Sequence, residues 1–349
     1  MTIILLLNGC LMIVKKNIQF NIVKGARLKK CLVGVLFMYG VDVYAETNFA
    51  SITLDNDVFV GKDNGYTNGL YFSLYNVGAG LRPNFWVSPL LWTMPRGYAE
   101  NRINVHSIGQ TLTTAEDITQ ANPPEGSLPY SGLLKYTNTY IIAGRRYADW
   151  ASTSVGIVGP AAKGKQTQTE FHALIGAEKP MGWDTQLKNE FVFGFSRGRA
   201  IRVLASRSDT IDLLAGGQLS VGTISSGVNA GMMLRIGQNL RDSYSTVSLA
   251  SSRASNPIAV NNSWFVYAGV SANYVFNQIF TDGNTFRDSR SIDYDHNYNT
   301  FMTGITYTIG RNSSLSFAYF SSFSDDDTEY SRQTERLNRF GTLTLAWEF

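Results

Sequence analysis

The chain has 349 residues, of which 44% are hydrophobic and 13% aromatic, and it carries a formal net charge of +3. Six of its 30 basic residues and one of its 27 acidic residues lie in residues 1–45, which leaves 24 basic and 26 acidic residues in residues 46–349, so the charge balance indicates no nucleic-acid partner. Both cysteines, Cys10 and Cys31, also lie in residues 1–45, so the remainder contains no thiolate nucleophile or thiolate metal ligand.

The N-terminal segment has the organisation of a secretory signal peptide. Basic residues between Lys24 and Lys30 precede the apolar run 31–39, and the small-residue sequence ending at Ala45 follows. This order of basic, apolar and small-residue segments is typical of export. We expect residues 1–45 to be a signal peptide, with the translation start open because Met12 could also initiate translation, and residues 46–349 to be the mature protein.

Residues 46–349 show the sequence pattern of a membrane β-barrel. No apolar run is long enough for a membrane helix, whereas short segments of alternating apolar and polar residues recur between turn residues. In one of them Leu70, Phe72 and Leu74 alternate with more polar residues. We expect twelve strands, near 48–57, 68–77, 101–115, 132–146, 149–158, 185–204, 209–224, 228–239, 263–279, 294–309, 313–323 and 337–349.

The end of the chain shows the clearest alternation. Leu343, Leu345, Trp347 and Phe349 share one side of a strand, and small or polar residues occupy the other. A wholly apolar face suits hydrocarbon and a polar face suits a lumen, although an edge strand of a soluble sheet is the alternative. We therefore expect an all-β, membrane-spanning antiparallel β-barrel of about twelve strands in the bacterial outer membrane, present as a monomer.

The longer connections are expected to carry further structure. Residues 161–175 have helical propensity, and we expect a short helix there in an extracellular loop at the outer rim. Residues 78–100 contain large apolar side chains between prolines, and this segment either lies along the membrane interface or, as we prefer, packs against the barrel end. The connections expected to face outward are 58–67, 116–131, 159–184, 205–208, 280–293 and 324–336.

Two parts of the chain provide candidate site residues. Asn56 and Asp57 end the first strand and Thr67 opens the second, so a hairpin would bring these side chains together. Asn, Asp and Gly are also ordinary turn residues, which is the alternative interpretation.

His172 lies in the predicted rim helix and is one of three histidines in the chain. Imidazole titrates near neutrality, so it suits a general base that activates water. Glu178 follows six residues later, on a different helix face, but a left-handed turn at Gly176 could bring it back towards His172. A loop histidine without a catalytic role is the alternative.

Five short stretches occur along the chain in a fixed order. They are Asn56-Asp57, Tyr66-Thr67 with Gly69, Tyr130-Ser131, Val158-Gly159-Pro160 and His172 through Lys179. In order and approximate spacing this combination resembles the lipid A 3'-O-deacylase family of outer-membrane enzymes. The resemblance implies a carboxylic ester hydrolase that removes the 3'-linked acyloxyacyl chain from lipid A in lipopolysaccharide of the outer leaflet. It also implies a calcium requirement and a site between the outer barrel wall and a helix of an extracellular loop.

Carried over residue by residue, the resemblance implies that His172 activates a water molecule. Asn56, Asp57 and Thr67 would surround the ester carbonyl and the metal, and Glu178 would support the histidine or the metal. Asp57 and Glu178 are therefore the candidate calcium ligands, since calcium prefers hard oxygen donors. With no cysteine and no matched Ser-His pair, water is the expected nucleophile.

One family feature is missing, and two other functions stay open. The family has a functional lysine in the loop after the third strand, and this chain has no lysine between residues 113 and 120. Either another cation, Lys163 or Lys165, contacts the lipid A phosphate, or the chain prefers a different lipid A headgroup.

The first alternative function is an outer-membrane phospholipase with a Ser-His-Asn triad, although the adjacent His106 and Ser107 would point to opposite faces of a strand. The second is a non-enzymatic porin or structural barrel.

Overall fold

The computed structural model describes residues 3–7, 10–14, 47–60, 66–95, 99–243, 263–310, 312–324 and 328–349. The chain divides into two units, residues 1–44 and 45–349. In the first unit, β1 (Ile3–Leu7) and β2 (Cys10–Val14) form an antiparallel hairpin. The basic, apolar and small-residue segments of the predicted signal peptide lie outside the described residues, so that assignment stays a prediction.

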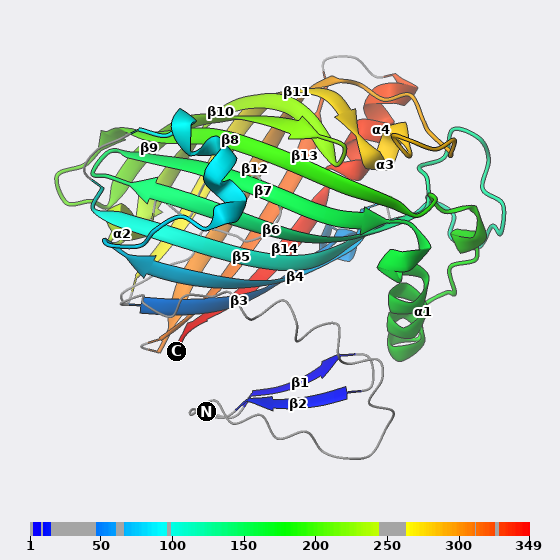
Figure 1. The fold of residues 1–349 in the computed structure, drawn as a ribbon, viewed down its shortest axis with the longest axis horizontal. Helices are drawn as coiled ribbons and strands as arrows, with labels where there is room; N and C mark the ends of the chain where they lie inside the picture. The colour runs from blue at the N-terminus through cyan, green and yellow to red at the C-terminus, as the bar shows by residue number, and fades with distance from the viewer. Residues whose placement is uncertain are drawn as a thin grey trace. The chain divides into compact units, whose positions relative to one another are not determined.

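The second unit is a closed barrel in which twelve antiparallel strands pair in sequence order and β14 closes on β3 (Figure 1). The predicted fold class and strand number are confirmed, with strand ends shifted by a few residues. No helix in the described ranges is long and apolar enough to cross a membrane. The strands are β3 (Thr47–Asn56), β4 (Tyr66–Gly78), β5 (Asn101–Thr113), β6 (Ser131–Ala143), β7 (Tyr147–Val158), β8 (Glu190–Ala205), β9 (Ile211–Gly222), β10 (Ser225–Gly237), β11 (Trp264–Gln278), β12 (Asn297–Ile309), β13 (Ser313–Phe323) and β14 (Phe340–Glu348).

The two faces of the wall alternate as the last strand predicts. Leu345 is 44% exposed on the outside, whereas Thr344 and Ala346 are buried inside the barrel. Thr344 shares a hydrogen bond of 2.9 Å with Thr53 across the closing strand pair. Because directly paired residues share a face, the strand register fixes which side chains point outward around the rest of the barrel.

Short helices occupy the connections. We call the end of the barrel where β3 begins and β14 ends the terminal end, and the opposite end the loop end. The predicted rim helix is confirmed as α1 at the loop end. The helical elements are η2 (Asp57–Val60), η3 (Phe85–Thr93), η4 (Pro160–Ala162), α1 (Gly164–Ile175), η5 (Gly182–Thr185), α2 (Leu240–Ser243), α3 (Ile279–Asp282) and α4 (Glu329–Leu337).

Two predicted connections differ from the structure. The connection after β8, at 205–208, was expected to face outward but lies at the terminal end. β8 is the sixth strand of the barrel counted from β3, and every second strand runs back towards the terminal end. Residues 78–100, expected to pack against the barrel end, instead place η3 on the outer wall, where the Thr153 hydroxyl donates to the Trp86 carbonyl at 2.7 Å.

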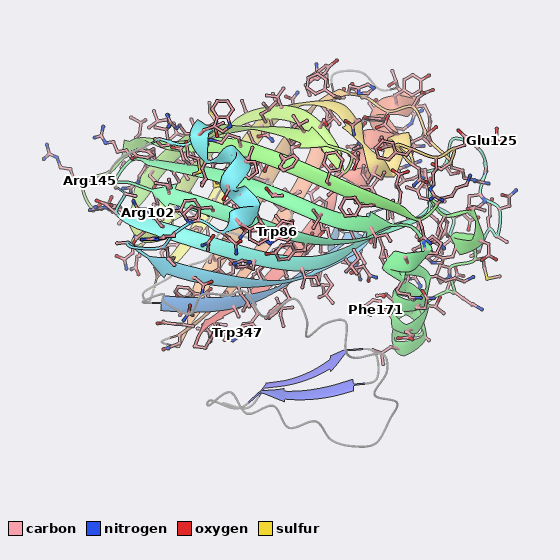
Figure 2. The ribbon with its side chains drawn as sticks, viewed as in Figure 1. Trp86, Arg102, Glu125, Arg145, Phe171 and Trp347 are labelled. Atoms are coloured by element: carbon pink, nitrogen blue, oxygen red, sulfur yellow. The ribbon has the colours of Figure 1, made fainter. Side chains whose placement is uncertain are left out.

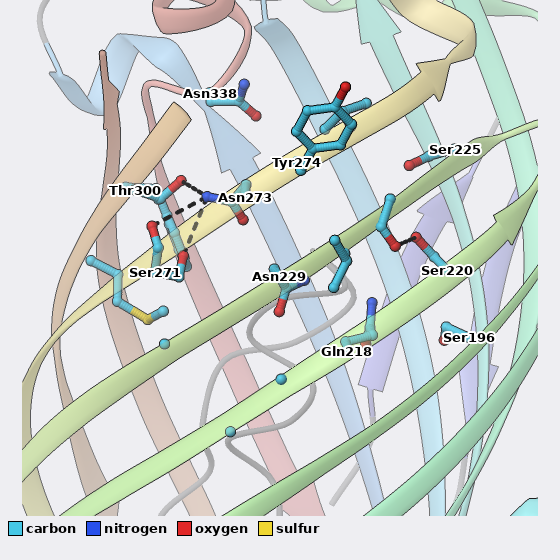
Figure 3. Close-up of a pocket in the computed structure, with 18 of the residues that line it drawn as sticks. Ser196, Gln218, Ser220, Ser225, Asn229, Ser271, Asn273, Tyr274, Thr300 and Asn338 are labelled. Atoms are coloured by element: carbon cyan, nitrogen blue, oxygen red, sulfur yellow. Dashed lines mark hydrogen bonds between the residues drawn. The ribbon is translucent and has the colours of Figure 1, made fainter. Parts of the chain in front are cut away.

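The lumen is occupied at both ends. At the terminal end the fully buried Arg235 donates to both carboxylate oxygens of Asp212 at 2.9 and 2.7 Å, and Arg202 donates to the same carboxylate at 2.7 Å. At the loop end, Ser322 of the inner wall donates to the Thr334 carbonyl of α4 at 3.2 Å. Between the arginine cluster at the terminal end and α4 at the loop end, the lumen contains a cavity of about 380 Å³ whose lining includes neutral polar groups such as Asn273 (Figure 3). A lumen filled in this way disfavours the porin alternative.

Candidate active site

The helix α1 begins against the outer face of the wall at the loop end. Leu112 of β5 and Gly132 of β6 are paired and point outward. A Cβ on Gly164 would lie 2.9 Å from a methyl carbon of Leu112, and one on Gly132 would lie 3.1 Å from the Gly164 Cα. Gln110, also outward-facing, donates to the Ala162 carbonyl at 2.5 Å. Glycine at position 164 therefore allows the helix to meet the wall closely.

One face of α1 is buried, and it carries His172. Gly164, Gln168 and His172 are spaced four residues apart, so they lie on one side of the helix. Gln168 is 2% exposed and accepts a 2.8 Å hydrogen bond from the indole of Trp183 in η5. His172 is 8% exposed, whereas Leu174 on the opposite side is 81% exposed. The imidazole is therefore on the protein side of the helix.

The backbone after α1 holds the imidazole ring. Nδ1 of His172 lies 2.6 Å from the Glu178 carbonyl oxygen. Because a carbonyl can only accept, Nδ1 carries the proton, and in the neutral ring Nε2 keeps its lone pair. The chain reverses at Gly176, which has φ 71° and ψ 22°, and the Ala177 N–H donates to the His172 carbonyl at 2.9 Å.

The predicted left-handed turn at Gly176 is thereby confirmed, and it brings Glu178 back to His172 as expected. The contact is made by the backbone carbonyl of residue 178, while its side chain is exposed. The support that Glu178 gives the imidazole is thus independent of its carboxylate. This leaves the carboxylate's role as a calcium ligand a prediction.

The first hairpin places Asn56, Asp57 and Thr67 at the same end of the barrel. Asn56 ends β3, and Asp57 begins η2 and is 1% exposed. Thr67 lies at a register shift, because Tyr66 pairs with Thr113 and Asn68 with Leu112. Such bulges occur often beside active sites, where they redirect a side chain. The Thr67 side chain itself lies outside the described part of the structure.

A row of outward positions joins the hairpin to the helix. Leu54 of β3 pairs with the exposed Leu70, so Asn56, two residues further along β3, is on the same outer face. In β4, Asn68 pairs with Leu112, and Leu112 pairs with Gly132. Neighbouring strands are about 4.8 Å apart and β3 is two strands from β5, so the end of β3 lies about 10 Å from the strand on which α1 packs. The hairpin end and the helix of His172 therefore share one end and one face of the wall.

The residues that dock α1 were not predicted. Gln110 and Leu112 look like ordinary positions of an alternating strand, and their pairing with a loop helix depends on residues about fifty positions away. Trp183 and Gln168 meet only because η5 folds back under α1. The sequence gives only a weak signal for this indole–glutamine hydrogen bond, because no nearby residue determines which side chain the Trp183 indole contacts.

The other two histidines have different surroundings. Nδ1 of His106 lies 2.7 Å from the hydroxyl of Tyr136 on the outer wall, whereas Ser107 contacts Ser73 inside the barrel. The predicted opposite orientation of His106 and Ser107 is confirmed, which disfavours a Ser-His dyad there. His296, in the loop before β12, donates from Nδ1 to the Val275 carbonyl at 2.6 Å.

The two lysines near the start of α1 differ in whether they already have a charged partner. Lys165 forms an exposed ion pair of 2.7 Å with Asp184, and hydrogen bonding from Lys165 lowers the pKa of the Asp184 carboxyl. Lys163 is exposed and adopts φ 64°, a left-handed conformation that is costly for a residue with a Cβ. It lies between Ala162 and Gly164, the two residues that contact the wall.

The donor types of the hairpin fit calcium, which takes six to eight hard oxygen ligands. The Asn56 amide and the Asp57 carboxylate supply such oxygens at the end of β3. Among the described side chains no group of three or more His, Cys, Asp or Glu could hold a metal. Calcium bound here would therefore also need hydroxyl, backbone carbonyl and water oxygens. Its binding by Asp57 and Glu178 stays a prediction.

The fold and the site define a twelve-stranded barrel of the outer-membrane type with a histidine-bearing helix on its outer wall. The model of the family described as Outer membrane protein LpxR matches residues 31–349. The chain therefore belongs to the LpxR family, which confirms the resemblance to the lipid A 3'-O-deacylases and places the protein in the bacterial outer membrane. No curated protein matches the sequence.

A solved structure shows the same fold. LpxR from Salmonella typhimurium matches with a TM-score of 0.67 and 15% identity, over 86% of this chain and 100% of that one. The translocator domain of the autotransporter NalP from Neisseria meningitidis gives a TM-score of 0.39 at 9% identity, over 86% of each chain. OprB from Pseudomonas putida gives 0.31 at 8% identity, over 87% of this chain and 93% of its own.

Proposed function

We propose that the protein is an outer-membrane esterase that hydrolyses the 3'-O-linked acyloxyacyl chain of lipid A. The observation that carries the proposal is the hydrogen bond from Nδ1 of His172 to the Glu178 carbonyl. It fixes the ring and leaves Nε2 as the basic atom, on the helix face turned towards the wall. A site outside the barrel at the loop end would meet lipid A by lateral diffusion in the outer leaflet.

The reaction would use water as the nucleophile. Nε2 of His172 takes a proton from the water as its oxygen attacks the ester carbonyl carbon, and the Glu178 carbonyl stabilises the imidazolium through its Nδ1–H. The amide of Asn56 and the hydroxyl of Thr67 are the groups we propose for the developing oxyanion. The imidazolium then protonates the leaving 3'-oxygen, which releases a free acyloxyacyl acid. General base catalysis of this kind contributes about 10²- to 10⁴-fold.

Calcium and a lysine complete the proposed site. Asp57 and Glu178 would hold the ion, which when bound would polarise the ester carbonyl and neutralise the oxyanion. Lys163 is the cation we propose for a lipid A phosphate, because Lys165 is already paired with Asp184. The protein would act as a monomer on lipopolysaccharide.

The proposal is tested with purified protein in detergent, incubated with lipopolysaccharide or with phospholipid and analysed by mass spectrometry. We expect loss of the 3'-acyloxyacyl group from lipid A, abolished by a calcium chelator and restored by added calcium. His172→Ala should reduce the rate by at least about 100-fold. His296→Ala is the matched control, because His296 is also a loop histidine bonded to a carbonyl. Hydrolysis of phospholipid alone would favour the phospholipase alternative.

A further inference from the structure

Residues 79–95, which we call the strap, are held on the outer wall near the terminal end. The strap contains η3, and outward-pointing side chains of β5 to β8 donate hydrogen bonds to its backbone carbonyls. The donor and acceptor pairs are Arg102 to Ala79, Asn104 to Arg82 at 2.9 Å, Tyr140 to Leu81 at 3.1 Å, Thr153 to Trp86 at 2.7 Å and Arg197 to Thr93 at 3.3 Å.

The opposite side of the strap is strongly apolar and exposed. Phe85 is 70% exposed and Trp92 is 79% exposed, whereas Val87 and Met94 are buried against the wall. A segment whose carbonyls are bonded inward and whose aromatic rings point outward is suited to lie against lipid. The strap therefore extends the lipid-facing surface of the barrel.

Charged side chains lie beside the strap on the same outer face. Arg197 and Arg199 of β8 point outward between Phe195 and Ile201, and the latter is 45% exposed. Both guanidinium groups pair with Asp149 of β7, whose side chain is fully buried, and the Arg199 contact is 3.0 Å. Two arginines share one carboxylate, so the group carries a net positive charge. The Arg199 side chain is 50% exposed.

Further arginines lie at this end of the barrel, and Figure 2 labels two of them, Arg102 and Arg145, at the end away from Phe171 of α1. The guanidinium of Arg199 lies 5.8 Å from the ring centre of Tyr147, and the exposed Arg145 and Arg146 precede Tyr147 in the turn between β6 and β7. Arg102 belongs to the same cross-strand row, because the register joins it through Ile142 and Asp149 to Arg199. Charged groups on a lipid-facing wall are expensive, which makes a ligand for them the default hypothesis.

We propose that the arginines at 102, 145, 146, 197 and 199, together with the strap, bind an anionic phospholipid of the periplasmic leaflet. Arg199 supplies an exposed guanidinium for the headgroup phosphate, and Arg145 and Arg146 add positive charge at the rim. Phe85 and Trp92 contact the acyl chains. This site lies at the terminal end of the barrel, whereas α1 lies at the loop end, so the lipid bound here is distinct from the proposed substrate.

The test is native mass spectrometry of the full-length mature protein in a nonionic detergent, titrated with phosphatidylglycerol or with phosphatidylcholine. We expect one phosphatidylglycerol bound in preference to phosphatidylcholine. Arg199→Gln should weaken that binding about ten-fold, the effect of losing one charge-assisted hydrogen bond. Because Asp149 keeps Arg197 as its partner, the variant should still fold, which heat-modifiable migration in gels would show.

Arg332→Gln is the matched control, because Arg332 is also an exposed arginine paired with a carboxylate, at the loop end. It should leave phosphatidylglycerol binding unchanged. A Trp92→Ala variant should weaken the binding of both lipids while keeping the preference between them. Equal binding of the two lipids by the wild-type protein, or equal losses in Arg199→Gln and Arg332→Gln, would overturn the proposal.

Discussion

Replacing Gly176 by alanine should loosen the contact that orients His172. Gly176 has φ 71°, and a Cβ there would meet no atom within 4 Å, so the substitution adds conformational strain but no collision. A left-handed conformation costs a residue with a Cβ about 1–2 kcal/mol. Nδ1 of His172 reaches the Glu178 carbonyl only when this turn has formed. The cost therefore lowers the fraction of molecules with a correctly oriented imidazole, by about 5-fold at 1 kcal/mol and about 30-fold at 2 kcal/mol.

The measurement is the initial rate of lipid A deacylation by purified protein, with folding verified by gel migration. Gly176→Asn is the matched control, because asparagine adopts the left-handed conformation more readily than alanine. We expect Gly176→Ala to lower kcat by up to the factor above and Gly176→Asn to stay within about two-fold of the wild-type rate. Equal rates for Gly176→Ala and the wild-type protein would refute the role of this turn.

Two further substitutions probe the docking of α1 and the lumen. Gly164→Ala would place its Cβ 2.6 Å from the Trp183 ring, so α1 should shift at a cost of about 1–3 kcal/mol and the deacylation rate should fall. Gly80→Ala is the control, because its Cβ would meet open space, and it should leave the deacylation rate unchanged. The readout is the deacylation rate of folded protein, and equal rates in the two variants would contradict the docking of α1. Arg235→Met should lower the free energy of unfolding by about 3 kcal/mol, the low end for a broken buried ion pair, because Asp212 keeps Arg202. Denaturant titration followed by tryptophan fluorescence measures this, and a loss below about 1 kcal/mol would show that Arg235 is not the residue that organises the lumen.

The barrel was predictable because its signal is local. Period-two alternation requires only neighbouring residues, so the exposed Leu345 and the buried Thr344 could be assigned from the sequence of one strand. The same holds for α1 and its end, since Gly176 marks a left-handed turn wherever the helix packs. These features needed no knowledge of distant partners.

The parts that were not predicted depend on distant contacts. The strap lies on the outer wall because its carbonyls meet donors such as Asn104 and Thr153, which come from separate strands. The helix α4 falls in a polar loop sequence and is buried through Thr334 by the inner wall. Residue 178 contacts His172 through a backbone carbonyl, a group that every residue carries and that sequence therefore cannot single out.

The mass of lipid A isolated from cells that produce the protein shows whether His172 acts as the base. We expect the wild-type chain to remove the 3'-acyloxyacyl group, and cells with His172→Ala to keep it although the barrel reaches the outer membrane in equal amount. Lipid A that loses this group equally with His172→Ala, or that is unchanged by the wild-type chain, would contradict the assignment of His172 as the base.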